Sequence, residues 1–149
     1  MRLSKNFVLS EITRSNTATR LGISNEPTKE HLENMQRLIL SLIQPMRNDL
    51  GPIRITSGYR SPSLNRAIGG SSRSQHSKAE ALDLQFWSEG KMNNKVIYDW
   101  IIDSGLEFDQ MINEFDFSWI HISLKKNSNR KQVLEAYKDG EGDTAYKLA

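Results

Sequence analysis

Two short segments hold the residues best suited to metal chemistry. The segment SRSQHSKAEALDLQF (72–86) contains His76 and, seven residues later, Asp83. The segment WIHISL (119–124) contains His121. Two imidazoles and one carboxylate form a known catalytic zinc set, in which the fourth coordination position stays open for water or substrate. The chain has no H-E-x-x-H motif, so spacing alone leaves an alternative open. In that alternative the residues are two hydrogen-bonded histidines and a surface aspartate that bind no metal.

Period-two alternation predicts that strands bring these side chains to one polar face. In 79–86, Asp83 lies on the face opposite Leu82, Leu84 and Phe86. In 119–124, His121 likewise points away from the apolar side chains. In 110–116, Glu114 and Asp116 share a face. Three neighbouring strands would therefore present Asp83, His121 and an acid together, with His76 entering from the preceding loop.

The remaining patterns predict the elements that carry this face. Apolar residues at steps of three and four from Leu32 to Met46 indicate a helix from about Thr28, kinked at Pro45 and ended by Gly51-Pro52. We further expect a strand at 53–56, a short helix between Ser61-Pro62 and Gly69-Gly70, a helix at 89–104, a hairpin of strands 108–115 and 119–124, and a strand or short helix at 133–137.

These elements indicate a single α+β domain over residues 1–149. A small, mostly antiparallel sheet would be flanked by helices, with the zinc site on its polar face. Residues 1–25 read as an irregular or short-helical lead-in. The DGEGD segment and the end, about 138–149, are expected to be a mobile tail.

Composition excludes several classes of protein. The chain has no cysteine, which excludes disulfides and thiolate metal sites. Its net charge of +2 and scattered lysines and arginines do not indicate nucleic-acid binding. No stretch has the ~18 apolar residues of a membrane span, and the N-terminus lacks a signal-peptide core. We therefore expect synthesis in the cytoplasm.

Three motifs in order resemble the zinc D,D-carboxypeptidase and L,D-endopeptidase family of peptidoglycan peptidases, above all its small single-domain phage members. They are SGYRSPSLNRAIGGSSRSQH, HSKAEALD and WIHISL, and the resemblance covers about residues 5–124. The family pattern S-x-H-x-x-G-x-A-x-D supplies two zinc ligands, and a later W-x-H supplies the third. The resemblance thus implies that His76, Asp83 and His121 bind Zn²⁺. Ala79 replaces the family's glycine, which matters only if the backbone there needs a positive φ.

The same resemblance implies a substrate-binding role for Arg60 in SGYRS. A guanidinium suits a peptide carboxylate or a polarised carbonyl. A surface arginine paired with an acid is the alternative. Ser74 matches the motif, and Gln75 is a candidate for lining the cleft or a plain loop residue.

The general base is where this chain departs from the family. Many members have an acid three residues before the last histidine ligand, and here that residue is Ser118. Glu114, in a stretch (DQMINEF) like one in phage-type members, is our first candidate, and Asp116 is the second. The alternative is that both acids are surface charges of a hairpin.

The expected function is hydrolysis of peptide bonds in bacterial peptidoglycan, next to D-amino acids. The setting would be a phage lysin that is released to the wall or carried in a virion. The partner is then the wall peptide, possible further partners are virion proteins, and the molecule is expected to be a monomer. The competing interpretation, motivated by Ser118, is a virion structural or wall-binding protein with little or no catalysis.

Overall fold

The computed structural model describes all residues, 1–149, and its centre is one six-stranded sheet in the order β1-β2-β6-β5-β7-β8. All neighbouring strands are antiparallel except β5 and β7, which run parallel. The predicted α+β class with a mostly antiparallel sheet is therefore confirmed. The strands are β1 (Arg54–Ser57), β2 (Ala81–Gln85), β5 (Gln110–Glu114), β6 (Trp119–Ser123), β7 (Gln132–Lys138) and β8 (Thr144–Leu148).

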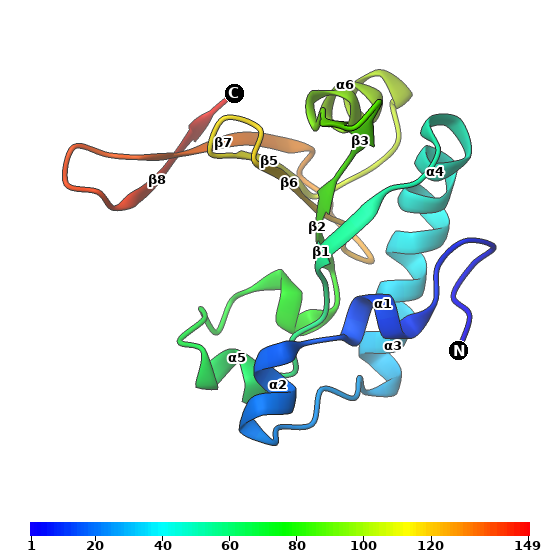
Figure 1. Ribbon diagram of the computed structural model, residues 1–149, viewed down its shortest axis with the longest axis vertical. Helices are drawn as coiled ribbons and strands as arrows, with labels where there is room; N and C mark the ends of the chain where they lie inside the picture. The colour runs from blue at the N-terminus through cyan, green and yellow to red at the C-terminus, as the bar shows by residue number, and fades with distance from the viewer.

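Helices surround the β1–β2 part of the sheet (Figure 1). Two short helices in the lead-in segment, α1 and α2, agree with its predicted short-helical character. The helical elements are α1 (Leu9–Thr13), α2 (Asn16–Leu21), α3 (Lys29–Leu38), the π-helical turn η1 (Ile39–Ile43), α4 (Gln44–Leu50), α5 (Pro62–Ala67), the 3₁₀ turn η2 (Gln75–Lys78) and α6 (Lys95–Ser104). None of them is long and apolar enough to cross a membrane.

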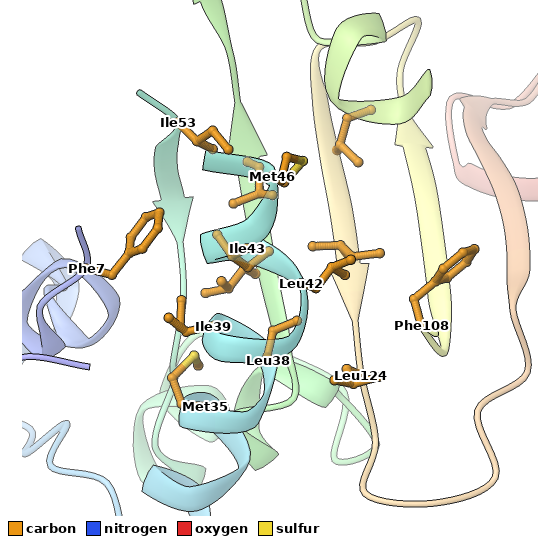
Figure 2. Packing of buried hydrophobic residues seen from close by; sticks show 14 of the residues in the cluster. Phe7, Met35, Leu38, Ile39, Leu42, Ile43, Met46, Ile53, Phe108 and Leu124 are labelled. Atoms are coloured by element: carbon orange, nitrogen blue, oxygen red, sulfur yellow. The ribbon is translucent and has the colours of Figure 1, made fainter. Parts of the chain in front are cut away.

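The continuous helix α3–η1–α4 supplies the centre of the core. Its apolar stripe faces the strands, with Phe7 from the lead-in segment on one side of the helix and Phe108 and Leu124 on the other (Figure 2). Leu82 and Leu84 of β2 and Ile120 and Ile122 of β6 are fully buried in the same cluster. The core therefore occupies one face of the sheet and leaves the other face free for polar side chains.

A widened turn accommodates Pro45, the residue at which the sequence predicted a kink. The π-helical turn at Ile39–Ile43 lies directly before it. Proline has no N–H to donate to the carbonyl four residues earlier, and a wider turn absorbs that missing hydrogen bond. The helix continues through Pro45 to Leu50.

Two predicted boundaries are wrong. The helix expected at 89–104 starts at Lys95, because residues 87–92 form a small hairpin of β3 (Trp87–Ser88) and β4 (Lys91–Met92). Its turn, Glu89-Gly90, has φ of 52° and 75°, the left-handed geometry of tight hairpins.

The segment from residue 138, expected as a mobile tail, contains strand β8 paired with β7. The carboxylate of Asp139 accepts hydrogen bonds from the backbone of Glu141 and Asp143, and Gly142 has a φ of 82°. The DGEGD segment is therefore a hairpin turn, because an aspartate that caps its own turn and a left-handed glycine together favour one.

Candidate metal centre and its cavity

Strand register places two of the three candidate ligands side by side. Asp83 of β2 is paired directly with His121 of β6. The residues on either side of both, Leu82, Leu84, Ile120 and Ile122, are fully buried on the core face. Asp83 and His121 therefore share the opposite face, as the alternation predicted.

His76 comes to the same place from the turn η2. The Ser74 hydroxyl caps this turn and accepts a hydrogen bond from the His76 backbone N–H at 3.3 Å. Ala79 ends the turn in the left-handed region, with a φ of 58°. The family's glycine position thus does need a positive φ here, and an alanine in that conformation costs about 1–2 kcal/mol.

The three side chains bring their ligand atoms together. His76 Nε2 lies 3.4 Å and His121 Nδ1 lies 3.3 Å from Asp83 Oδ1. All three atoms lie within 4.8 Å of one another. The side chains are 7%, 12% and 18% exposed for His76, His121 and Asp83, so one side remains open to a ligand.

The backbone at Gly58 orients the His76 ring. The carbonyl oxygen of Gly58 lies 2.8 Å from His76 Nδ1. Because a carbonyl only accepts, Nδ1 carries the proton, and in the neutral ring Nε2 has a free lone pair. That lone pair faces the Asp83 carboxylate, an arrangement that a cation between them would satisfy. Such an outer partner on the far ring nitrogen is typical of metal-binding histidines.

Asp83 is held in its ionised form. Burial acts to raise its pKa, but the His121 and His76 rings, which in their protonated forms donate to the carboxylate and carry positive charge, outweigh burial and keep the pKa well below the usual range. The donor set is thus two imidazole nitrogens and one carboxylate oxygen without sulfur. Its chemistry fits zinc with an open fourth position.

These ligands line a cavity of about 750 Å³ on the polar face of the sheet. One side is made of Arg60 and of residues 70–80 in and around η2, and the other comes mainly from the strands. Every candidate site residue predicted from the sequence lines this cavity except Asp116. The lining includes Arg60, Arg73, Ser74, Gln75, His76, Lys78, Glu80, Asp83, Asp109, Ile112, Glu114, Phe115, Trp119, His121, Leu134, Thr144 and Tyr146.

Glu114 is the acid on this face. It ends β5 opposite Trp119, two residues from Ile112, which pairs with His121. Its side chain is largely buried, and the aromatic rings of Phe115 and Trp119 lie 5.6 Å apart beside it in the cavity wall. Burial first, and then the Asp83 carboxylate, raise the pKa of Glu114 to about 7, although His76 acts in the opposite direction. A carboxyl with that pKa is suited to exchange protons near neutral pH.

Asp116 and Ser118 lie elsewhere. Asp116 is exposed in the β5–β6 turn and does not line the cavity, because three successive residues, 115–117, take positive φ and turn it away from the strand face. The Ser118 hydroxyl donates to the carbonyl of Phe115 at 2.7 Å. Of the two acids considered, only Glu114 is positioned beside the three ligands.

The substrate-binding candidates occupy the opposite wall. Arg60 donates to the Ser74 hydroxyl at 3.0 Å, and its Nε is buried without a partner. Gln75 donates its amide to Asp109 at 2.9 Å. Arg60 therefore keeps a free donor near the cavity, whereas Ser74 and Gln75 are engaged in holding the loop that carries His76.

Two residues of this site have no signal in strand alternation or ligand spacing. Gly58 orients His76 from 18 positions earlier in the chain. Asp109 is fully buried and binds Gln75 and Arg130. Gly58 lies in the segment SGYRS and Asp109 in the segment DQMINEF. Their hydrogen-bond partners are distant in sequence and become evident only in the fold.

Comparison with known families and proteins agrees with this geometry. A family model described as peptidase M15 matches residues 5–123, which include all three candidate ligands and Glu114. No curated protein matches the chain.

Proposed function

The chain belongs to the peptidase M15 family, and from that premise we propose that it is a zinc-dependent peptidase acting on the peptide bonds of bacterial peptidoglycan. His76 Nε2, His121 Nδ1 and an oxygen of Asp83 would hold the zinc ion. When bound, zinc would supply a Lewis acid that polarises a carbonyl and makes water more acidic. One observation carries the proposal: the three ligand atoms share a cavity with a buried glutamate whose pKa is near neutral.

Glu114 supplies proton transfer in this proposal. Its carboxylate takes a proton from the attacking water and then passes it to the nitrogen of the leaving amine. A positioned acid/base of this kind contributes roughly 10²–10⁴-fold to the rate. Because Glu114 shares the strand face with the ligands, no movement of the sheet is needed for it to face the same substrate bond.

Arg60 supplies binding on the opposite wall. Its guanidinium is always charged and offers several donors, so it suits a carboxylate or a carbonyl oxygen of the wall peptide. Ser74 holds the Arg60 side chain through one of its terminal nitrogens. Arg60 is therefore assigned to anchoring the substrate rather than to proton transfer.

The first experiment is metal content by plasma mass spectrometry of the wild type, His76→Ala and His121→Ala. We expect about one zinc per chain in the wild type and loss of zinc in both variants.

The second experiment measures the release of peptide fragments from purified peptidoglycan by the wild type and by Glu114→Gln. The glutamine variant should keep zinc and lose hydrolysis. Absence of metal after dialysis against zinc would overturn the enzyme assignment and favour a wall-binding or virion structural role.

We also propose the setting of a phage lysin, supported by the resemblance of the three motifs to small phage members. Purified protein added to bacterial cells with permeabilised outer layers should lower the turbidity of the suspension. A Glu114→Gln sample at equal concentration is the control. If the protein hydrolysed isolated peptidoglycan without lysing cells, the proposed peptidase activity would stand and the proposed lysin role would be contradicted.

A further inference from the structure

The C-terminal hairpin β7–β8 lies outside the residues matched by the family model, yet it forms part of the cavity wall. The family match ends at residue 123. Leu134 of β7 and Thr144 and Tyr146 of β8 nevertheless line the cavity of the metal site. Figure 1 shows this hairpin, orange to red, extending from the edge of the sheet remote from β1.

Register places these side chains on the face that carries the ligands. Glu114 pairs with Ala136, and Ala136 pairs with Tyr146, so the three residues form one row across β5, β7 and β8. Ile112 and Leu134 form the neighbouring row. Since adjacent strands are roughly 4.8 Å apart, the backbone of Tyr146 lies roughly 10 Å from that of Glu114. Between them stands only the buried methyl group of Ala136.

Tyr146 is available to a ligand. The residue lines the cavity and is 54% exposed, so its ring is accessible from solvent. Partial burial, and then the carboxylate of Glu114, raise the pKa of its phenol. A peptide bond seated at the ligands would thus have Glu114 beside it and the Tyr146 ring beyond Glu114, on the same side.

The two walls differ in chemistry. The hairpin wall presents an aliphatic chain, a hydroxyl and a phenol ring, and none of its three lining residues is charged. Lys138, which donates to Thr144, lies over the ring of Phe115 and does not line the cavity. The opposite wall presents Arg60, Arg73 and Lys78. These cations outnumber the one carboxylate beside them, Glu80, so carboxylates of a substrate would lie toward that wall, and small apolar side chains toward the hairpin.

We propose that Tyr146, together with Leu134 and Thr144, determines substrate preference by contacting small apolar side chains of the peptide on the Glu114 side of the scissile bond. This inference rests on the proposed peptidase function. The hairpin is then a specificity element added to the family domain, whose ligands and acid/base all lie before residue 124.

The test compares two synthetic wall peptides that differ only next to the scissile bond, one with alanine there as the small apolar probe and one with glycine. Wild type should prefer the alanine peptide by roughly fourfold for each methyl group that it buries. Tyr146→Ala should raise KM for the alanine peptide about tenfold with kcat little changed, because the lost contact is made equally in the ground and transition states. Tyr146→Phe should keep the preference if the ring makes the contact.

Tyr137→Ala is the matched control. Tyr137 lies in the same hairpin but on the opposite face, since it neighbours Ala136 in β7, and it does not line the cavity. It should change KM less than twofold. Thermal melting of all three variants separates a changed contact from a misfolded hairpin. Equal KM and unchanged preference in folded Tyr146→Ala, with active wild type, would overturn this inference and leave the peptidase function intact.

A binding measurement separates the two proposals. Backbone amide shifts of the zinc-loaded, full-length Glu114→Gln protein are followed while the alanine peptide is added. Shifts at Leu134, Thr144 and Tyr146 would support the specificity wall even if wild type hydrolysed neither peptide, in which case the peptidase function alone fails. Shifts confined to Arg60 and the η2 loop would overturn the role of the hairpin.

Discussion

Gly58 shows how one residue without a side chain orients a candidate metal ligand, His76. A β-carbon there would meet the carbonyl oxygen of Ile12, the same oxygen that accepts the Tyr59 backbone N–H at 2.8 Å. Gly58→Ala must therefore displace the segment whose carbonyl orients His76. Losing such a partner typically lowers metal affinity roughly 10–100-fold. Competition with a zinc chelator measures it, and Gly140→Ala, at an open position, should show no change.

At Glu114, function and stability oppose each other. The pKa of this carboxyl is about 7 in the folded chain and about 4.3 when unfolded, so the folded state prefers the protonated form. Metal-free protein should thus lose stability as pH rises from about 4.3 to 7. Glu114→Gln should remove that loss and stabilise the metal-free protein at pH 8 by about 1–2 kcal/mol, measured by urea unfolding. A less stable glutamine variant at pH 8, or an unchanged pH dependence, would contradict this.

Residue patterns predicted which side chains share the polar face of the sheet, but not the contacts that orient them. Leu82, Leu84, Ile120 and Ile122 alternate with Asp83 and His121, and alternation is a local property of a strand, so the sequence alone places these side chains on one face. The prediction that Asp116 shares this face was wrong, because residues 115–117 take positive φ and leave the strand geometry. The tautomer of His76 depends on a carbonyl 18 positions away, and no local pattern contains that contact.

At the scale of elements, buried Asp109 joins three segments around the site. It accepts hydrogen bonds from the backbone and guanidinium of Arg130, from the amide of Gln75, and lies 3.6 Å from Lys125. It thereby connects the start of β5 with the η2 loop and with the loop after β6. Burial acts to raise its pKa, but the hydrogen bonds from Arg130 and Gln75 prevail and lower the pKa to about 2.

Asp109→Asn should destabilise the fold by about 1–3 kcal/mol, since a buried charge-assisted network loses its acceptor charge. The stability that the carboxylate contributes is present above its unfolded pKa of about 3.9 and is lost as pH falls toward 2. Wild type and variant should therefore converge in acid, as thermal melts at pH 2 to 7 would show. Asp99→Asn, in an exposed pair with Lys95, should cost less than about 0.5 kcal/mol.

Element types were easier to predict than their ends. The apolar stripe from Leu32 to Met46 is long and strongly periodic, and the segment does form a helix whose apolar side packs in the core. The start of α6 and the presence of β8 each depend on a tight turn. Glu89-Gly90 forms a left-handed hairpin turn before α6, and Asp139, which caps its own turn, together with left-handed Gly142 forms the turn before β8. In both places the geometry of the turn outweighs the apolar pattern around it.

At the scale of the molecule, the metal site and the hydrophobic core lie on opposite faces of the sheet. The core is a cluster of 22 buried residues centred on α3–η1–α4, and neither His76, Asp83 nor His121 belongs to it. The fold therefore has its own source of stability, unlike small domains that unfold without zinc. Removing metal should leave a folded protein that has lost only its ligand-linked stability.

Zinc should accordingly shift the melting temperature by mass action. At a free zinc concentration 100 times the Kd, binding adds about 2.7 kcal/mol, which for a chain of this length corresponds to roughly 5–10 °C. His76→Ala should melt at the same temperature with and without zinc. Scanning calorimetry with zinc and with a chelator measures both. Complete loss of the circular-dichroism signal on chelation would show instead that zinc is part of the core stability, and that the two faces of the sheet do not fold independently of the metal.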